Sequence, residues 1–239
     1  MMSKITGVLV DNHIYDINND MKNGYHFPNC LFPGATFKMV IDNDPVNNGK
    51  VKWSCSTDAD NNVLAVSQDG TVTFPDVDEK CIGKIFAIFA TDKSTNKSAG
   101  IYIFTVKRFF KYSIETYDSV QKVLPWVESM NGEFPEAHDI DSYDYDDDYA
   151  THIIKREVNA GLYQEWGNIA NSGWNTINED SGVCGIYAFN KDNNSYYYLS
   201  NDGFRQKFGA GYHAQAVASY SEPIVWLYFL STIICIIAA

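Results

Sequence analysis

A two-residue apolar period constrains the fold of the first hundred residues more strongly than any other feature. In residues 35–41, ATFKMVI, every second side chain is apolar, beginning with the alanine. In residues 51–56, VKWSCS, Val51, Trp53 and Cys55 alternate with polar side chains. Such alternation predicts strands that bury one face.

Turn residues separate these segments. The Asp-Gly pair at 69–70 divides LAVSQDGTVTF into two short strands, because this pair tolerates positive φ. Residues 84–90, KIFAIFA, and 100–106, GIYIFTV, are apolar on both faces, as in the central strands of a sandwich. We therefore predict an immunoglobulin-like β-sandwich with Trp53 in its core and Cys55 as a buried free thiol rather than a disulfide partner.

The pattern changes after residue 107. Apolar side chains at spacings of three, four and three residues predict a helix with Pro125 inside it and Gly132 after it. These side chains are Tyr117, Val120, Leu124 and Val127. The first half of 151–169 is a second candidate helix. Residues 184–208 are interpreted as two strands around Asn-Asp-Gly, so this half is predicted to be α+β.

Charge divides the chain at the same place. Residues 1–107 carry 12 acidic and 10 basic side chains, and residues 108–239 carry 18 and 8. The net charges are therefore −2 and −10. We predict two domains that meet near Arg108 and pack closely, because TVKRFFKYS contains no Gly or Pro linker.

Composition and motifs argue against several classes of function. A net charge of −12 disfavours nucleic acid, since phosphate binding needs clustered Lys and Arg. No C-x-x-C or H-E-x-x-H motif supports a zinc site. The His residues are scattered and no nucleophile motif occurs. We predict no catalytic residues, no metal and no cofactor.

The two ends of the sequence carry different signals. The first 16 residues lack the apolar stretch of a signal peptide, so we expect a piece of a longer precursor or a cytoplasmic chain. Residues 223–239 carry no charge. They are interpreted as a membrane anchor, as a last strand over 222–228 with an apolar extension, or as a terminus foreign to the fold.

Motifs along most of the chain resemble a known family. GATF, WSCS and SQDGTVTF lie in the first half, and GEFP and LYQEWGNIANSGW lie in the second. In their order and spacing they are similar to the C-terminal passenger region of the intimin/invasin family, the inverse autotransporter adhesins. The resemblance implies an all-β bacterial Ig-like domain at 1–107, an α+β C-type-lectin-like domain at 108–228, and an apolar extension at 229–239.

The resemblance also implies a function. Such a region is the extracellular end of a bacterial outer-membrane adhesin, displayed by an upstream β-barrel. Its lectin-like tip is presented to a surface receptor on a host or neighbouring cell, for adhesion, invasion and virulence. A protein receptor is favoured over a glycan. A non-binding structural spacer and a carbohydrate-binding lectin are the alternatives.

The chain departs from the family at one covalent link. The family's lectin-like module usually carries a disulfide from its first helix to a Cys near its C-terminus. The corresponding positions here are Val127 and a residue near Trp226, and neither is Cys. The loss costs about 2–4 kcal/mol if nothing compensates. The module needs its last strand to close the sheet, so a strand over 222–228 is the favoured interpretation of the tail.

An acidic stretch is the first candidate receptor site. Residues 139–148 contain six Asp, but they lack the Gly and the final Glu of a calcium loop. The stretch is interpreted as a metal site, as a solvated loop, or as a partner contact. We predict that Asp144 and Asp146 contact a receptor.

Two aromatic residues complete the predicted receptor site. Trp174 lies in GWNT, where Thr176 replaces the Asp of sugar-binding lectins. Tyr197 is the middle of three successive tyrosines, and exposed Tyr is frequent at interfaces. For both side chains, packing in the core is the alternative to receptor contact.

Overall fold

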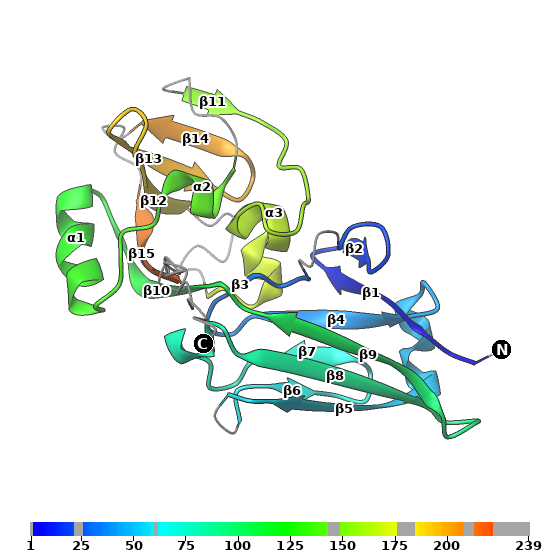
Figure 1. The fold of residues 1–239 in the computed structure, drawn as a ribbon. Helices are drawn as coiled ribbons and strands as arrows, with labels where there is room; N and C mark the ends of the chain where they lie inside the picture. The colour runs from blue at the N-terminus through cyan, green and yellow to red at the C-terminus, as the bar shows by residue number, and fades with distance from the viewer. Residues whose placement is uncertain are drawn as a thin grey trace, which may run out of the picture.

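The computed structural model describes residues 2–21, 26–59, 62–142, 149–175, 185–207 and 213–221. These residues form a mostly β-sheet structure with few helices (Figure 1). In the first region, residues 2–107, one sheet has the strand order β2-β1-β4-β7-β6. Its strands are β1 (Ile5–Val10), β2 (His13–Asp16), β4 (Thr36–Ile41), β6 (Ala65–Val66) and β7 (Thr71–Thr73).

A second sheet of the first region has the order β5-β8-β9. It contains β5 (Val51–Thr57), β8 (Ile85–Asp92) and β9 (Ser98–Thr105). Two short 3-10 helices, η1 (Pro45–Lys50) and η2 (Glu79–Cys81), are the helical elements described before residue 105. The predicted strands of this region are therefore confirmed.

The second region, residues 108–221, is built on the sheet β11-β14-β13-β12-β15-β10-β3. This sheet contains β3 (Cys30–Leu31), which comes from the first region. Its other strands are β10 (Arg108–Tyr117), β11 (Tyr149–Thr151), β12 (Gly185–Asn190), β13 (Ser195–Ser200), β14 (Phe204–Lys207) and β15 (Ala214–Ser221). The helices are α1 (Val120–Ser129), α2 (Ala137–Ile140), α3 (Leu162–Trp166) and the 3-10 helix η3 (Ile169–Ser172).

Burial in the first region follows the alternation, with two differences. Trp53 is buried and its indole N–H donates to the Asn48 carbonyl at 3.2 Å. Cys55 is a free thiol, as expected, but it is only half-buried. The sequence predicted that both faces of β8 and β9 are covered, as in central strands. Instead β9 is an edge strand of its sheet, and Ile101 and Ile103 are exposed.

The second region confirms one predicted helix and corrects the other. In α1, Val120, Val123 and Val127 are buried against Ala side chains of β15, and the helix continues through Pro125. Residues 152–157 are not helical, because their backbone donors are bonded elsewhere. Here His152 N–H donates to Gly203 and Glu157 N–H donates to Gln164. Helix α3 follows instead, after a Gly at positive φ.

The hydrophobic core passes from one region into the other without a break. Strand β3, from the first region, pairs in parallel with β10 at the start of the second. Aromatic rings then stack across the junction. Phe27 and Phe32 lie 4.7 and 4.9 Å from the Trp166 ring, and Phe32 lies 5.1 Å from Trp174. The expected close packing near Arg108 is therefore present.

Two glycines bring the backbones of the regions into contact. Gly34 and Gly173 have φ of 83° and 100°. A Cβ on Gly34 would lie 2.6 Å from the Gly173 carbonyl oxygen, and a Cβ on Gly173 would lie 1.9 Å from that of Gly34. Any side chain at either position must push the two regions apart.

We expect Gly173→Ala to destabilise the protein by about 2–4 kcal/mol, through left-handed strain and the backbone clash. Gly49→Ala is the matched control, since a Cβ there meets no atom within 4 Å. Urea unfolding of both variants measures the difference. Equal midpoints for the two variants would contradict the close approach at Gly34.

Candidate functional site at the junction of the two regions

A buried carboxylate, that of Glu165 on α3, connects the two regions. It accepts the backbone N–H groups of Asn29 and Cys30 at 3.0 and 3.1 Å, and that of Asn159 at 2.7 Å. The Cys30 thiol donates to the same carboxylate at 3.1 Å. Glu165 thereby fixes the start of β3 and the loop before α3 in one arrangement.

The pKa values at this carboxylate argue against nucleophilic chemistry. Burial raises the pKa of Glu165, while the hydrogen bonds from Cys30 and Asn159 oppose the shift. Burial and the adjacent Glu165 raise the pKa of the Cys30 thiol well above its usual range. A reactive cysteine needs the opposite shift, because the thiolate is the nucleophile. The Cys30–Glu165 pair is therefore structural.

An arginine completes the junction on the β1–β2 side. The Arg156 guanidinium lies 3.4 Å from the Asp11 carboxylate. It also donates to the backbone carbonyls of Val10 at 3.3 Å and Glu165 at 2.9 Å. The Tyr15 hydroxyl donates to the Gln164 carbonyl at 2.7 Å. These contacts join the β1–β2 hairpin of the first region to α3 of the second.

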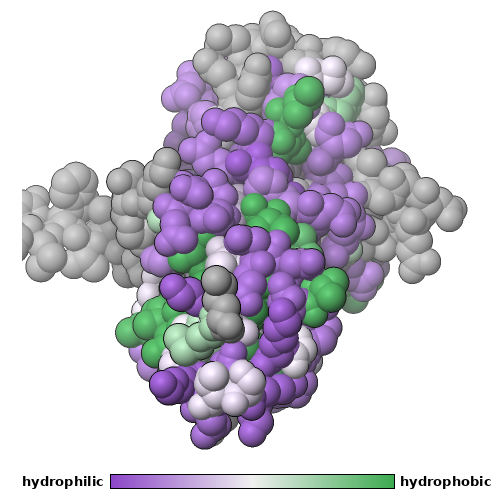
Figure 2. All heavy atoms as spheres, turned by 90° about the vertical axis from the view of Figure 1, so that its right-hand side faces the viewer, coloured by the Kyte–Doolittle hydropathy of each residue, from purple (hydrophilic) through white to green (hydrophobic). Residues whose placement is uncertain are grey.

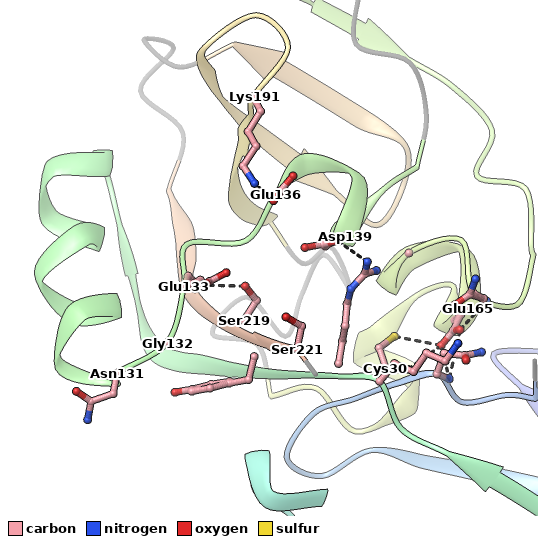
Figure 3. Close-up of a pocket in the computed structure, with 16 residues that line it drawn as sticks. Cys30, Asn131, Gly132, Glu133, Glu136, Asp139, Glu165, Lys191, Ser219 and Ser221 are labelled. Atoms are coloured by element: carbon pink, nitrogen blue, oxygen red, sulfur yellow. Dashed lines mark hydrogen bonds and ion pairs between the residues drawn. The ribbon is translucent and has the colours of Figure 1, made fainter. Parts of the chain in front are cut away.

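An open cleft of about 870 Å³ lies beside this network (Figure 3). Its walls come from β3, β10, the segment 131–139, α3 and the end of β15. Arg108 pairs with Asp139 across it at 3.0 Å, and Lys191 pairs with Glu136. Figure 3 shows Lys191 and Glu136 at the top, Asp139 below them, and Cys30 and Glu165 at the lower right. The charges of these four residues are mutually neutralised.

Among the residues that the structure describes, no three His, Cys, Asp or Glu side chains are grouped to hold a metal ion. The cleft offers polar and paired charged groups that suit a polar ligand or a protein loop.

The structure places the predicted receptor residues differently. Asp144 and Asp146 lie outside the described residues. Trp174 is 2% exposed, and its indole N–H donates to the Gln215 amide oxygen at 2.8 Å. Tyr197 is 1% exposed. Burial of both rings favours the packing alternative, and neither ring presents a surface to a partner in this structure.

Sequence reasoning missed an aromatic cluster in the second region. Phe134, Phe189 and Tyr196 are each partly exposed. The Tyr196 ring lies 5.2 Å from Phe134 and 4.9 Å from Phe189. The alternation in β13 could have predicted that Tyr196 is exposed. Tyr197 shares a face with buried Leu199, so Tyr196 and Tyr198 point to the other face.

Comparison with known proteins identifies the architecture. No protein family model and no curated protein sequence matches the chain. The crystal structure of invasin, described as a bacterial integrin-binding protein, is similar over 92% of the chain, with a TM-score of 0.68. The chain has an invasin-like fold. Sequence identity to invasin is 20%, and the chain spans 40% of the invasin chain.

The similarity to invasin agrees with the family resemblance at the level of the fold. One superposition covers nearly all of the chain, and so both regions. In the part of the sequence that the structure describes, no helix is long and apolar enough to cross a membrane.

We expect Glu165→Gln to destabilise the protein by about 2–4 kcal/mol. In the wild-type protein the backbone N–H groups around Glu165 donate to the two carboxylate oxygens. In the variant, the side-chain NH₂ group replaces one of these oxygens and cannot accept their hydrogen bonds. Glu157→Gln is the control, since that side chain is 59% exposed and pairs loosely with Lys155. Urea unfolding compares the two variants, and similar midpoints would show that the Glu165 carboxylate is dispensable.

We also expect stability to decline in alkali. Burial raises the pKa of Cys81 to about 12 and that of Tyr15 above its ordinary value of 10.0. The folded chain therefore retains protons that the unfolded chain releases. The contribution of Tyr15 is complete below pH 10 and is lost as pH rises towards the folded pKa.

Urea unfolding between pH 8 and 11 tests this dependence. Tyr15→Phe should flatten the decline above about pH 10, by at most about 1.4 kcal/mol per pH unit, because one titrating group is removed. Tyr117→Phe, a partly exposed tyrosine on β10, is the control. Identical slopes for wild type and Tyr15→Phe would refute the assignment.

Proposed function

We propose that this chain is the C-terminal extracellular region of a bacterial outer-membrane adhesin. In this proposal, residues 1–107 are an Ig-like domain that carries a C-type-lectin-like domain, residues 108–228. The single observation that supports it most is the similarity to invasin over 92% of the chain, which includes both regions. The aromatic rings and hydrogen bonds at the junction suit a rigid stalk and tip.

The proposed partner is a protein on a host-cell surface. Invasin is described as an integrin-binding protein, so integrin ectodomains are the first receptors to test. The net charge of −10 on residues 108–239 favours a receptor with a basic patch. Association should then weaken as salt rises, since screening reduces steering between opposite charges.

We place the binding surface on the second region, around loops 137–150 and 163–176 and strand β13. The predicted contacts Asp144 and Asp146 belong to the first loop. The aromatic cluster of Phe134, Phe189 and Tyr196 supplies the partly exposed rings that interfaces favour. Trp174 and Tyr197 support these segments from inside the domain.

Binding of the purified chain to cultured epithelial cells and to immobilised integrin ectodomains tests the proposal. We expect Asp144→Ala/Asp146→Ala, and separately Tyr196→Ala, to weaken binding about tenfold or more. The control, Glu115→Ala/Glu128→Ala, removes two exposed acidic side chains outside these loops and should bind normally.

Each other outcome of that experiment has a defined meaning. Wild-type protein that binds neither cells nor integrins would support the spacer alternative. Binding to a glycan array without protein binding would support the lectin alternative. Unchanged binding by both loop and Tyr196 variants would show that the surface lies elsewhere.

A further inference from the structure

One face of the first region is apolar and exposed. Alternation directs Ile85, Ile101 and Ile103 away from the core, and they are 50%, 55% and 51% exposed. Ile103 pairs with Ala87 and Ile101 pairs with Phe89 across β8 and β9. The three exposed isoleucines, with the partly exposed Phe89 and the buried Ala87 between them, form one apolar patch, named here the isoleucine face. Figure 2 shows hydrophobic residues reaching the surface of the lower half of the molecule.

This face has the properties of a covered surface. Scattered exposed apolar residues are common, but adjacent exposed isoleucines on one sheet face promote association. Strand β9 is also an edge strand of its sheet, and long apolar edges are normally protected. Both faces of β8 and β9 carry apolar side chains, and this pattern is typical of strands that are covered on both sides.

The chain leaves the described fold beside one end of this face. Ser221, the last described residue, pairs with Arg108. Arg108 follows Thr105, the end of β9, by three positions, and Thr105 pairs with Ile85. Next to this pair, Ile82 forms an isolated parallel β-bridge with Val106. The isoleucine face therefore begins close to the point where residues 222–239 start.

The residues that follow have matching chemistry and sufficient length. Beyond Glu222 the sequence is PIVWLYFLSTIICIIAA, without a charged side chain. The 18 residues reach about 60 Å when extended. The face covers about 13 Å along β8, from Ile85 to Phe89.

We propose that residues 229–238 bind the isoleucine face of the same chain. Attachment at Ser221 gives the segment a high effective concentration at this surface, which a second copy or a membrane lacks. Binding removes three isoleucine side chains and the segment's own apolar side chains from water. This inference is independent of the receptor proposal.

Cys235 provides a reporter within the segment. Maleimide labelling of the native full-length chain, read by peptide mass spectrometry, gives the alkylation rate of Cys235 separately from the other cysteines. In Ile101→Asp/Ile103→Asp, we expect Cys235 to react about tenfold faster than in wild type, because the face no longer holds the segment. Val46→Asp is the control, since Val46 is 86% exposed on η1, outside the face.

A second measurement keeps the test independent of the double variant's folding. A benzophenone amino acid at position 103 of the full-length chain should cross-link within one chain to residues 229–238. Equal Cys235 rates in wild type and the double variant, without that cross-link, would overturn the proposal. Protection that rises with protein concentration would assign the face to a second copy. Protection of Cys235 from alkylation that is seen only with phosphatidylethanolamine–phosphatidylglycerol vesicles would assign the segment to a membrane. Dependence on protein concentration and dependence on vesicles would each overturn the proposal.

Discussion

The carboxylate of Glu165 is the interaction on which the arrangement of the two regions depends. Its acceptor positions are filled by the N–H groups of Asn29, Cys30 and Asn159 and by the Cys30 thiol. With the start of β3 held there, β3 is placed to pair with β10, and Phe32 next to it packs against Trp166. A buried carboxyl group with several backbone donors has few alternative geometries, so it selects one relative position of the regions.

Hydrophobic burial alone does not supply that selection. The rings that cross the junction provide much of the buried apolar surface, but apolar contact is non-directional. Direction comes from the polar groups around them. Arg156 donates to carbonyls of both regions, and Gly34 and Gly173 allow backbone contact that no other residue type permits without strain. The rings stabilise the junction, and the polar contacts and glycines determine its geometry.

The sequence predicted local features well and long-range features poorly. Strands such as β4 and β5 were predictable because their period of two is visible within seven residues. The helix expected in 151–159 does not form, because distant groups such as Gly203 accept its backbone donors. Glu165 could not be identified, since its main partner, Cys30, lies 135 positions away. Tyr197 was chosen among three tyrosines although alternation already buries the middle one.

Helix α1 shows how the second region is held where the family resemblance implies a disulfide. Val127 stands at the implied cysteine position and is buried with Val120 and Val123. These side chains pack on Ala214, Ala216 and Ala218 in a small cluster that is separate from the main core. The same cluster contains the buried Tyr187, and larger side chains of α1 such as Leu124 and Trp126 pack against it. Such burial stabilises the folded chain, but it does not constrain the unfolded chain as a covalent link does. The attachment of α1 therefore depends on apolar packing, in which the alanines of β15 lie under the valines of the helix.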